Sequence, residues 1–378
     1  MNSPLHVREF EKRRSEASPL VRFMGVQKSY DGTVLVVKGL DLDVTRGEFL
    51  TLLGPSGSGK TTCLMMLAGF ELPTAGEILL DGRPISRLPP NRRGIGVVFQ
   101  NYALFPHMTV AENVAFPLSV RRMSRDVIAT HVRRALDMVQ LKGFDQRKPA
   151  QLSGGQQQRV AVARALVFEP ELVLMDEPLG ALDKQLREQM QLEIKHLQQR
   201  VGVTLVYVTH DQAEALTMSD RIAVFDRGEV QQLATPTELY EAPRNAFVAG
   251  FIGENNRLPG TVISADGEWC TVKLEDGPVV EAVRVGEHGP GDGVILSLRP
   301  ERISPLADAG RHANRFPAIV EELIYLGDHL RVRVSGVGRS DLVMKIPNQA
   351  GDLALRVGSS VHCGWRREDV RALKDDPR

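Results

Sequence analysis

The sequence predicts an α/β domain with a mostly parallel sheet, followed by a small all-β domain. Short apolar runs alternate with amphipathic segments from residue 21 to about residue 251, which is typical of strands and helices that follow one another along the chain. Between about residues 101 and 168 the apolar spacing is helical, which indicates a helical insertion. After residue 252, short β-prone runs are separated by Gly, Pro, Asp and Asn. We therefore expect domains at residues 21–251 and 252–378.

The first elements can be placed in order along the chain. Residues 1–20 mix acidic and basic side chains with little apolar periodicity, so we expect a mobile N-terminal extension. Residues 48–53 (EFLTLL) predict a buried strand that ends in a glycine-rich turn, and residue 60 begins a predicted helix. Residues 172–176 and 204–209 are further apolar runs followed by helical patterns, and they predict neighbouring core strands.

Two capping boxes predict where helices begin. Thr109 is followed three residues later by Glu112, and Thr235 is followed by Glu238 with Pro at the first helical position. In the C-terminal region, residues 293–298 (GVILSL) and 330–334 (LRVRV) predict strands.

Composition excludes several classes of protein. The chain has 378 residues, with 47 Lys and Arg against 47 Asp and Glu, so the net charge is zero and a nucleic-acid partner is not expected. The three cysteines are far apart and odd in number, which argues against a disulfide framework or a cysteine-rich metal site. Since no run of about 18 apolar residues occurs, we expect a soluble, cytoplasmic chain that meets membranes only through partner proteins.

Residues 54–61 (GPSGSGKT) match the phosphate-binding pattern G-x-x-x-x-G-K-[ST]. Glycines let successive backbone N–H groups point at phosphate oxygens, and the N-terminus of the following helix favours negative charge. Lys60 would reach the β and γ phosphates, and the Thr61 hydroxyl would bind Mg²⁺. The alternative, a simple glycine turn, is disfavoured by the flanking strand and helix. The predicted nucleotide-binding residues of this loop are Gly54, Pro55, Ser56, Gly57, Ser58, Gly59, Lys60, Thr61 and Thr62.

A second strand supplies the carboxylates that a triphosphate site needs. Asp176 and Glu177 follow four apolar residues, so the acids emerge at the end of a buried strand. We expect Asp176 to bind Mg²⁺ through water and Glu177 to orient or deprotonate the attacking water. An acidic pair at this position also occurs as a solvated strand end, and the phosphate loop in the same chain is what favours the catalytic interpretation.

Residues 152–156 (LSGGQ), followed by QQRVAVARAL, resemble the signature of ATP-binding cassette (ABC) ATPases. The resemblance covers about residues 21–251 and includes, in the family's order, Tyr30, Gln100, residues 180–183 (GALD) and His210. It implies a P-loop NTPase fold with a helical subdomain, and ATP and Mg²⁺ as cofactors.

The resemblance also implies roles for single residues. Tyr30 would stack on adenine, Gln100 would contact Mg²⁺ and the attacking water, and His210 would contact the γ phosphate. By themselves, a tyrosine and a histidine at such positions are more often ordinary core or turn residues.

The signature implies a homodimer. Ser153, Gly154, Gly155 and Gln156 resemble a second phosphate-binding helix start, which the family places on the ATP of the opposite subunit. With one phosphate loop and one signature, the chain would need a second copy for catalysis. Asp183 would lie at that contact; Gly180 stands where many relatives have Ser, and Ala-Leu-Asp at 181–183 keeps the family pattern.

The C-terminal region resembles the TOBE-type, OB-like β domain found in ATPase subunits of bacterial solute importers. The resemblance rests on residues 298–303 (LRPERI), 321–328 (EELIYLGD) and 363–365 (CGW). It implies two membrane permease subunits, a solute-binding protein reached through them, and a peripheral location at the cytoplasmic face of the bacterial inner membrane. The domain itself would serve either dimerisation or regulation. The alternatives are a soluble, non-transport ABC ATPase and an unrelated P-loop switch.

In its overall likeness, which includes residues 251–258 (FIGENNRL) at the domain junction, the chain most resembles the ATPases of spermidine and putrescine importers. Importers of ferric iron, of sugar or glycerol phosphate, and of sulfate remain alternatives, because likeness at this level is a weak guide to the solute.

Overall fold

The computed structural model describes residues 19–180, 182–275, 277–305, 313–336, 342–348 and 355–375. The predicted N-terminal extension therefore lies outside the described residues, apart from its last two positions. The chain divides into two compact units between Thr237 and Glu238. The first unit is α/β and the second consists mainly of strands, which confirms the predicted fold class.

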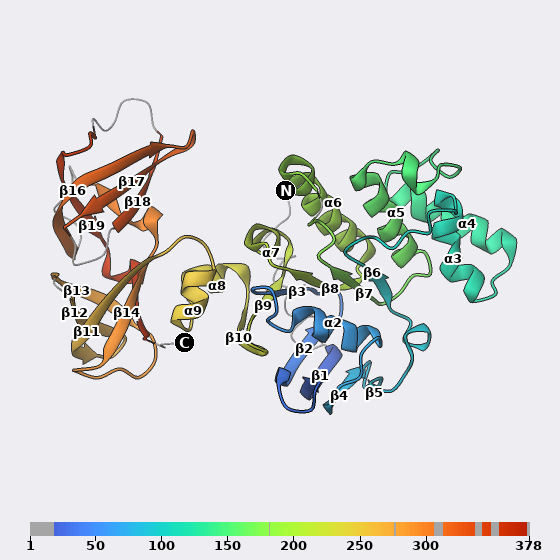
Figure 1. Cartoon of the computed structure of the whole chain (residues 1–378), viewed down its shortest axis with the longest axis horizontal. Helices are drawn as coiled ribbons and strands as arrows, with labels where there is room; N and C mark the ends of the chain where they lie inside the picture. Colours follow the sequence, from blue (N-terminus) through green and yellow to red (C-terminus); the bar gives the residue numbers. More distant parts are fainter. Residues whose placement is uncertain are drawn as a thin grey trace, which may run out of the picture. The chain divides into compact units, whose positions relative to one another are not determined.

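A six-stranded sheet forms the centre of the first unit, with strand order β10-β9-β3-β8-β7-β6 (Figure 1). Its strands are β3 (Phe49–Leu53), β6 (Gly96–Val98), β7 (Leu172–Asp176), β8 (Thr204–Thr209), β9 (Arg221–Asp226) and β10 (Glu229–Ala234). The pairs from β6 through β7, β8 and β3 to β9 are parallel, and β10 joins β9 antiparallel. β3, β7 and β8 are buried at every residue, as their continuous apolar sequences predict.

The central strands separate two hydrophobic cores, because successive residues of a strand point to opposite faces of the sheet. On β7, Leu172 and Leu174 pack in a core that includes α2 (Lys60–Ala68) and a second, antiparallel sheet, whereas Val173 and Met175 pack with the helical region. The second sheet has the order β2-β1-β4-β5. Its strands are β1 (Pro19–Ser29), β2 (Leu35–Thr45), β4 (Ala75–Leu80) and β5 (Arg83–Pro84).

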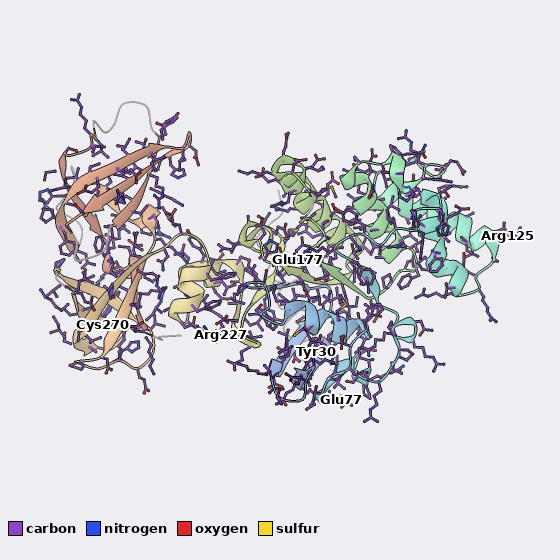
Figure 2. The ribbon with its side chains drawn as sticks, viewed as in Figure 1. Tyr30, Glu77, Arg125, Glu177, Arg227 and Cys270 are labelled. Atoms are coloured by element: carbon purple, nitrogen blue, oxygen red, sulfur yellow. The ribbon has the colours of Figure 1, made fainter. Side chains whose placement is uncertain are left out.

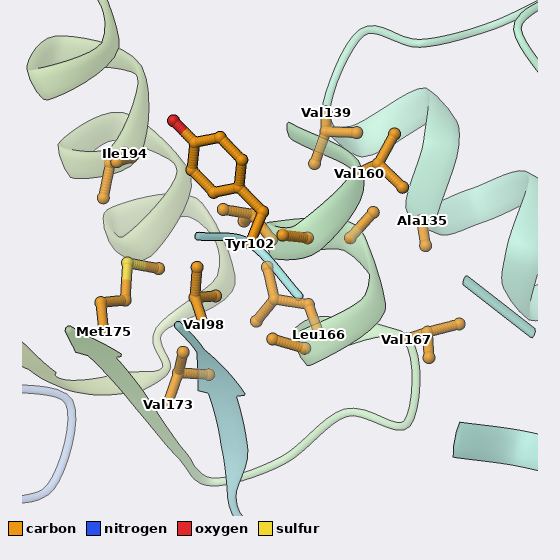
Figure 3. Close-up of a cluster of buried hydrophobic side chains, with 14 of the residues drawn as sticks. Val98, Tyr102, Ala135, Val139, Val160, Leu166, Val167, Val173, Met175 and Ile194 are labelled. Atoms are coloured by element: carbon orange, nitrogen blue, oxygen red, sulfur yellow. The ribbon is translucent and has the colours of Figure 1, made fainter. Parts of the chain in front are cut away.

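Helices form the segment between about residues 101 and 168, as predicted. Thr109 begins the first of them, with Glu112 N donating to Thr109 Oγ1 at 3.2 Å and Thr109 N donating to Glu112 Oε2 at 2.7 Å. Figure 3 shows part of their buried core around Tyr102. The remaining helices and 3₁₀ turns of this unit are α3 (Val110–Val120), α4 (Arg125–Met138), α5 (Gly154–Leu166), α6 (Lys184–Val201), α7 (Gln212–Met218), η1 (Pro90–Arg92) and η2 (Pro149–Gln151).

The second unit contains two β-structures after a pair of short helices. The helix α8 (Pro236–Glu241) begins at the predicted proline, and α9 (Ala246–Phe251) follows it. A closed barrel is formed by β11 (Asn256–Asp266), β12 (Trp269–Leu274), β13 (Val279–Arg284), β20 (Val370–Lys374) and β14 (Gly293–Leu298). A five-stranded sheet is formed by β15 (Ser304–Pro305), β19 (Ser360–Trp365), β16 (Asn314–Tyr325), β17 (His329–Ser335) and β18 (Leu342–Pro347). The 3₁₀ turns are η3 (Pro300–Arg302) and η4 (Arg367–Asp369).

The two β-structures repeat one sequence pattern, which the spacing of apolar residues did not reveal. Residues 256–262 (NRLPGTV) begin β11, and residues 314–320 (NRFPAIV) begin β16. Asn256 exchanges hydrogen bonds of 2.9 and 2.8 Å with the backbone of Val343, and Asn314 exchanges bonds of 2.9 and 2.8 Å with that of Glu281. In addition, β20 follows the sheet strand β19 along the chain but pairs with β14 of the barrel. Likewise, β15 follows the barrel strand β14 but pairs with β19 of the sheet. The two halves are therefore interlocked and share one hydrophobic core.

Candidate active site

The phosphate-binding loop follows β3 and leads into α2. Gly57 and Gly59 have φ angles of 79° and 101°, a left-handed region that glycine adopts readily because it has no side chain. The loop is also too crowded for larger residues: a Cβ at Gly54 would lie 2.3 Å from the carbonyl oxygen of Phe225, and one at Gly59 would lie 2.8 Å from that of Val36. The backbone therefore forms a close-fitting cradle at a helix N-terminus, which suits a phosphate group.

Lys60 is held inside this cradle. Its Nζ donates hydrogen bonds to the carbonyl oxygens of Gly54 and Pro55, at 2.9 and 2.8 Å, and to Ser58 Oγ at 3.3 Å. Burial lowers the pKa of Lys60, and the carboxylates of Glu177 and Asp176 partly oppose that shift. The ammonium group is thus held by oxygens of the loop itself. Of the remaining loop residues, Ser56 is exposed and Thr62 is half-buried.

The sheet brings the acidic pair to the loop. Thr61 Oγ1 donates a hydrogen bond of 3.1 Å to Asp176 Oδ1, although 115 positions separate the two residues. The contact arises because β3 and β7 both pair in parallel with β8, so their carboxyl ends lie at the same edge of the sheet. Asp176 is 8% exposed, and burial raises its pKa while the hydrogen bond from Thr61 lowers it.

Glu177 and His210 form the next contact. His210 Nδ1 lies 3.2 Å from Glu177 Oε2, and Glu177 N donates to the carbonyl oxygen of Val208 at 3.0 Å. The φ angle of Glu177 is +42°, an uncommon value for a residue with a side chain. The backbone therefore holds Glu177 in a strained conformation at the edge of the sheet, a position labelled in Figure 2.

Tyr30 and Gln100 lie at exposed positions. Tyr30, labelled in Figure 2, is 62% exposed, which excludes a core tyrosine. Lys28 Nζ lies 4.8 Å from the centre of its ring. Gln100 follows β6 and makes no side-chain hydrogen bond to any other residue that the structure describes. It is therefore not joined to Thr61 or Asp176 in this conformation.

The signature residues form a second group, apart from the phosphate loop. Ser153 is the N-cap of α5: Gln156 N donates to Ser153 Oγ at 3.4 Å, and Ser153 N donates to Gln156 Oε1 at 3.0 Å. A Cβ on Gly154 would lie 3.3 Å from a methyl carbon of Leu182, next to Asp183, which caps α6. Within the described parts of the chain, no hydrogen bond joins this group to residues 54–62.

The structure contains a groove beside the helical region that no sequence pattern predicted. It has a volume of about 530 Å³ and lies among α2, β6, α3 and α5. Its exposed apolar residues include Phe70, Phe116 and Val120, at 53%, 38% and 59% exposure. Their wide separation along the chain explains why spacing alone does not reveal the groove.

Arg164, on α5, fixes one wall of this groove. It donates 2.6 and 2.8 Å hydrogen bonds to the carbonyl oxygens of Tyr102 and Ala103, which follow Gln100 closely and have φ angles of 61° and 47°. The loop after Gln100 is therefore held against the helix that begins at the signature.

A backbone cradle with a buried lysine, next to a strand that ends in two carboxylates, defines a P-loop nucleotide-binding protein. Comparisons with known proteins agree with this class and make it more specific. Residues 37–180 match the ABC transporter family, and residues 296–373 match the TOBE domain.

Two similar proteins carry the same description, spermidine/putrescine import ATP-binding protein. The one from Rubrobacter xylanophilus is 49% identical over 93% of each chain, and the one from Thermobifida fusca is 46% identical over 95% of this chain and 94% of its own. The chain therefore belongs to the family of ABC transporter ATP-binding proteins, and it is an ABC-type ATPase with a C-terminal TOBE domain.

Two solved structures resemble part of the chain. A dimeric post-hydrolysis state of the cassette MJ0796 bound to ADP and Pi is 36% identical and covers 57% of this chain and 98% of its own, with a TM-score of 0.51. The cbiO1 protein of Clostridium perfringens, part of the complex cbiONQ, is 28% identical and covers 59% of this chain and 90% of its own, with a TM-score of 0.55. No helix in the described ranges is long and apolar enough to cross a membrane.

Proposed function

We propose that this ATPase is the energy-coupling subunit of an importer for polyamines such as spermidine and putrescine. The observation that carries the proposal is the similarity to import proteins of that description, at 46–49% identity across both units. Similarity restricted to the ATPase would not support a particular solute, because that machinery is shared among transporters of many substrates. The complex would act at the cytoplasmic face of the bacterial inner membrane.

For hydrolysis, we assign Glu177 as the base that accepts a proton from the attacking water at a side-chain oxygen. His210, 3.2 Å away, would hold that carboxylate and meet the γ phosphate. Lys60 and the cradle would bind the phosphates, and the exposed ring of Tyr30 would stack on adenine.

The oxygens of Thr61 and Asp176 suit a hard cation such as Mg²⁺, which takes oxygen ligands and keeps several waters. Gln100 would join them after a movement of its loop. When bound, the ion would neutralise charge on the phosphates.

A homodimer would complete the site. The start of α5 with Ser153 and Gly154 is exposed, and it is not joined to the loop of its own chain, so it is free to meet the nucleotide of a second copy. The dimeric state described for the similar cassette MJ0796 supports this arrangement. Two-fold symmetry would then give two equivalent shared sites.

In the homodimer, the groove of each copy, which contains Phe116 and Val120, would receive a helix from one of the two membrane permease subunits. Exposed apolar side chains lining a concave surface favour an amphipathic helix as the partner. Arg164 holds the loop after Gln100 against this groove, so docking there could alter the position of Gln100.

Uptake of labelled spermidine in a strain lacking this subunit tests the solute assignment. Uptake should be lost and should return with the wild-type gene but not with Glu177→Gln. Unchanged spermidine uptake in the deletion strain would refute it, and parallel assays with ferric iron, sulfate and glycerol phosphate would identify another solute. Val120→Asp tests the groove: ATP hydrolysis by the isolated subunit should persist while uptake falls, and normal uptake would refute the docking assignment.

A further inference from the structure

Arg187, on the first turn of α6, joins two loops that flank Glu177. Its Nη2 donates a hydrogen bond of 3.0 Å to the carbonyl oxygen of Leu182, and its Nη1 donates one of 3.2 Å to Asp211 Oδ2. Leu182 lies near the end of the loop that Glu177 begins, and Asp211 directly follows His210. One guanidinium group therefore contacts both neighbouring segments of the candidate base.

These contacts form a closed ring of residues that includes Glu177. Glu177 contacts His210 at 3.2 Å, and His210 is bonded covalently to Asp211, which pairs with Arg187. From Arg187 the path returns to Leu182, whose backbone N donates a 3.1 Å hydrogen bond to the carbonyl oxygen of Leu179, two positions after Glu177. That loop has its own turn bonds, with Gly180 N donating to the carbonyl oxygen of Glu177 at 3.3 Å. The position of Glu177 relative to His210 thus depends on the loop at both ends.

In this ring of contacts, Asp211 is supported by a buried polar network. Asp211 N donates to Thr209 Oγ1 at 3.0 Å, and Thr209 in turn donates to Glu214 Oε2 at 2.7 Å. Glu214 is 2% exposed and also accepts a 2.8 Å hydrogen bond from the hydroxyl of Tyr207. Arg187 Nε lies 4.0 Å from Glu214 Oε1. Arg187 Nε itself has no hydrogen-bond partner among the described residues. The hydrogen bonds that join Asp211 and Thr209 to the buried Glu214 nevertheless fix the acidic partner of the arginine.

We propose that Arg187 is a positioning residue for ATP hydrolysis. It would set the separation of Glu177 and His210 by tying the loop that ends near Leu182 to the loop that carries His210. Holding both the Leu182 carbonyl and the Asp211 carboxylate requires arginine, because its planar guanidinium has several N–H donors in fixed directions. The single ammonium nitrogen of lysine cannot reach both acceptors in the same geometry. The residue would touch neither nucleotide nor water itself, and its effect would be on turnover and not on binding.

The first test compares Arg187→Met with Arg187→Lys in the full-length chain. We expect kcat to fall by about tenfold or more in Arg187→Met, with the KM for ATP unchanged within about twofold, and Arg187→Lys to recover little of the loss. Arg200→Met is the matched control, because Arg200 is an exposed arginine at the far end of the same helix, and it should retain normal turnover. Wild-type kcat in Arg187→Met, or full activity in Arg187→Lys, would overturn the proposal.

A double-mutant cycle separates positioning from a general loss of structure. If Arg187 acts through the Glu177–His210 contact, Arg187→Met should lower single-turnover hydrolysis by less than about twofold in a His210→Ala background. Effects that multiply in the double mutant would show an independent structural role and would overturn the proposal.

Asp211→Asn provides a second variant in case Arg187→Met does not fold. It weakens the ion pair while keeping an oxygen that can cap α7, and it should lower kcat by about fivefold with KM preserved. Wild-type kcat in Asp211→Asn would contradict the proposed clamp.

Discussion

Replacing Glu177 by Gln should abolish turnover while leaving ATP binding intact. Glutamine has nearly the same size as glutamate, so the backbone bond from Glu177 N to Val208 and the strained turn can persist. The substitution removes the carboxylate oxygen that lies 3.2 Å from His210 Nδ1 and that would accept the proton, because an amide is not a base at neutral pH. A general base contributes about 10²- to 10⁴-fold to rate, which corresponds to about 2.7–5.4 kcal/mol of the activation barrier.

The assay measures phosphate release for kcat and a fluorescent ATP analogue for the dissociation constant. We expect kcat to fall by at least about 100-fold and the dissociation constant to change by less than about threefold. Glu171→Gln is the matched control, because Glu171 lies just before the opposite end of β7, is 66% exposed and pairs with Arg46 at 2.9 Å. Wild-type turnover in Glu177→Gln, or an equal loss in Glu171→Gln, would refute the assignment of Glu177 as the base.

Three further predictions concern stability and reactivity. Asn256→Ala or Asn314→Ala each removes two hydrogen bonds to the backbone and should lower the free energy of unfolding by about 2–5 kcal/mol in urea titrations, whereas Asn348→Ala, at an exposed site, should have little effect. All three cysteines are buried, and burial raises the pKa of Cys63 to about 12, so a thiol reagent at pH 8 should label the chain only after unfolding; rapid labelling of the native chain would contradict this. Burial also raises the pKa of Glu214, so the folded chain keeps a proton that the unfolded chain loses, and stability from this group falls as pH rises above about 4.3. The melting temperature of Glu214→Gln should therefore improve relative to wild type as the pH rises through that window, and a difference independent of pH would contradict the shift.

Local sequence was sufficient for the elements whose chemistry is local. A continuous apolar run fits a strand buried on both faces, and β7 and β8 have the predicted bounds. Thr109 followed by Glu112 can satisfy the first N–H groups of a helix, and α3 begins there. The glycine-rich loop could also be predicted locally, because the positive φ angles of Gly57 and Gly59 favour residues without side chains.

The repeated pattern of the second unit was missed for a different reason. The matching segments are only seven residues long, and their equivalent roles become clear only when Asn256 and Asn314 are seen to bond each other's β-structure. The strands β15 and β20 exchange places between the halves, which spacing along the chain does not express.

By itself, the sequence determined which chemical groups are present and what each short segment can do: a cradle for phosphate, an acidic strand end, and a capped signature helix. Only the tertiary structure decided which groups meet. Thr61 contacts Asp176 across 115 positions, Glu177 contacts His210, and Arg187 joins Leu182 to Asp211. The physical reason is that backbone preferences and caps act over a few residues, whereas contacts between distant side chains depend on strand order and on how the cores pack.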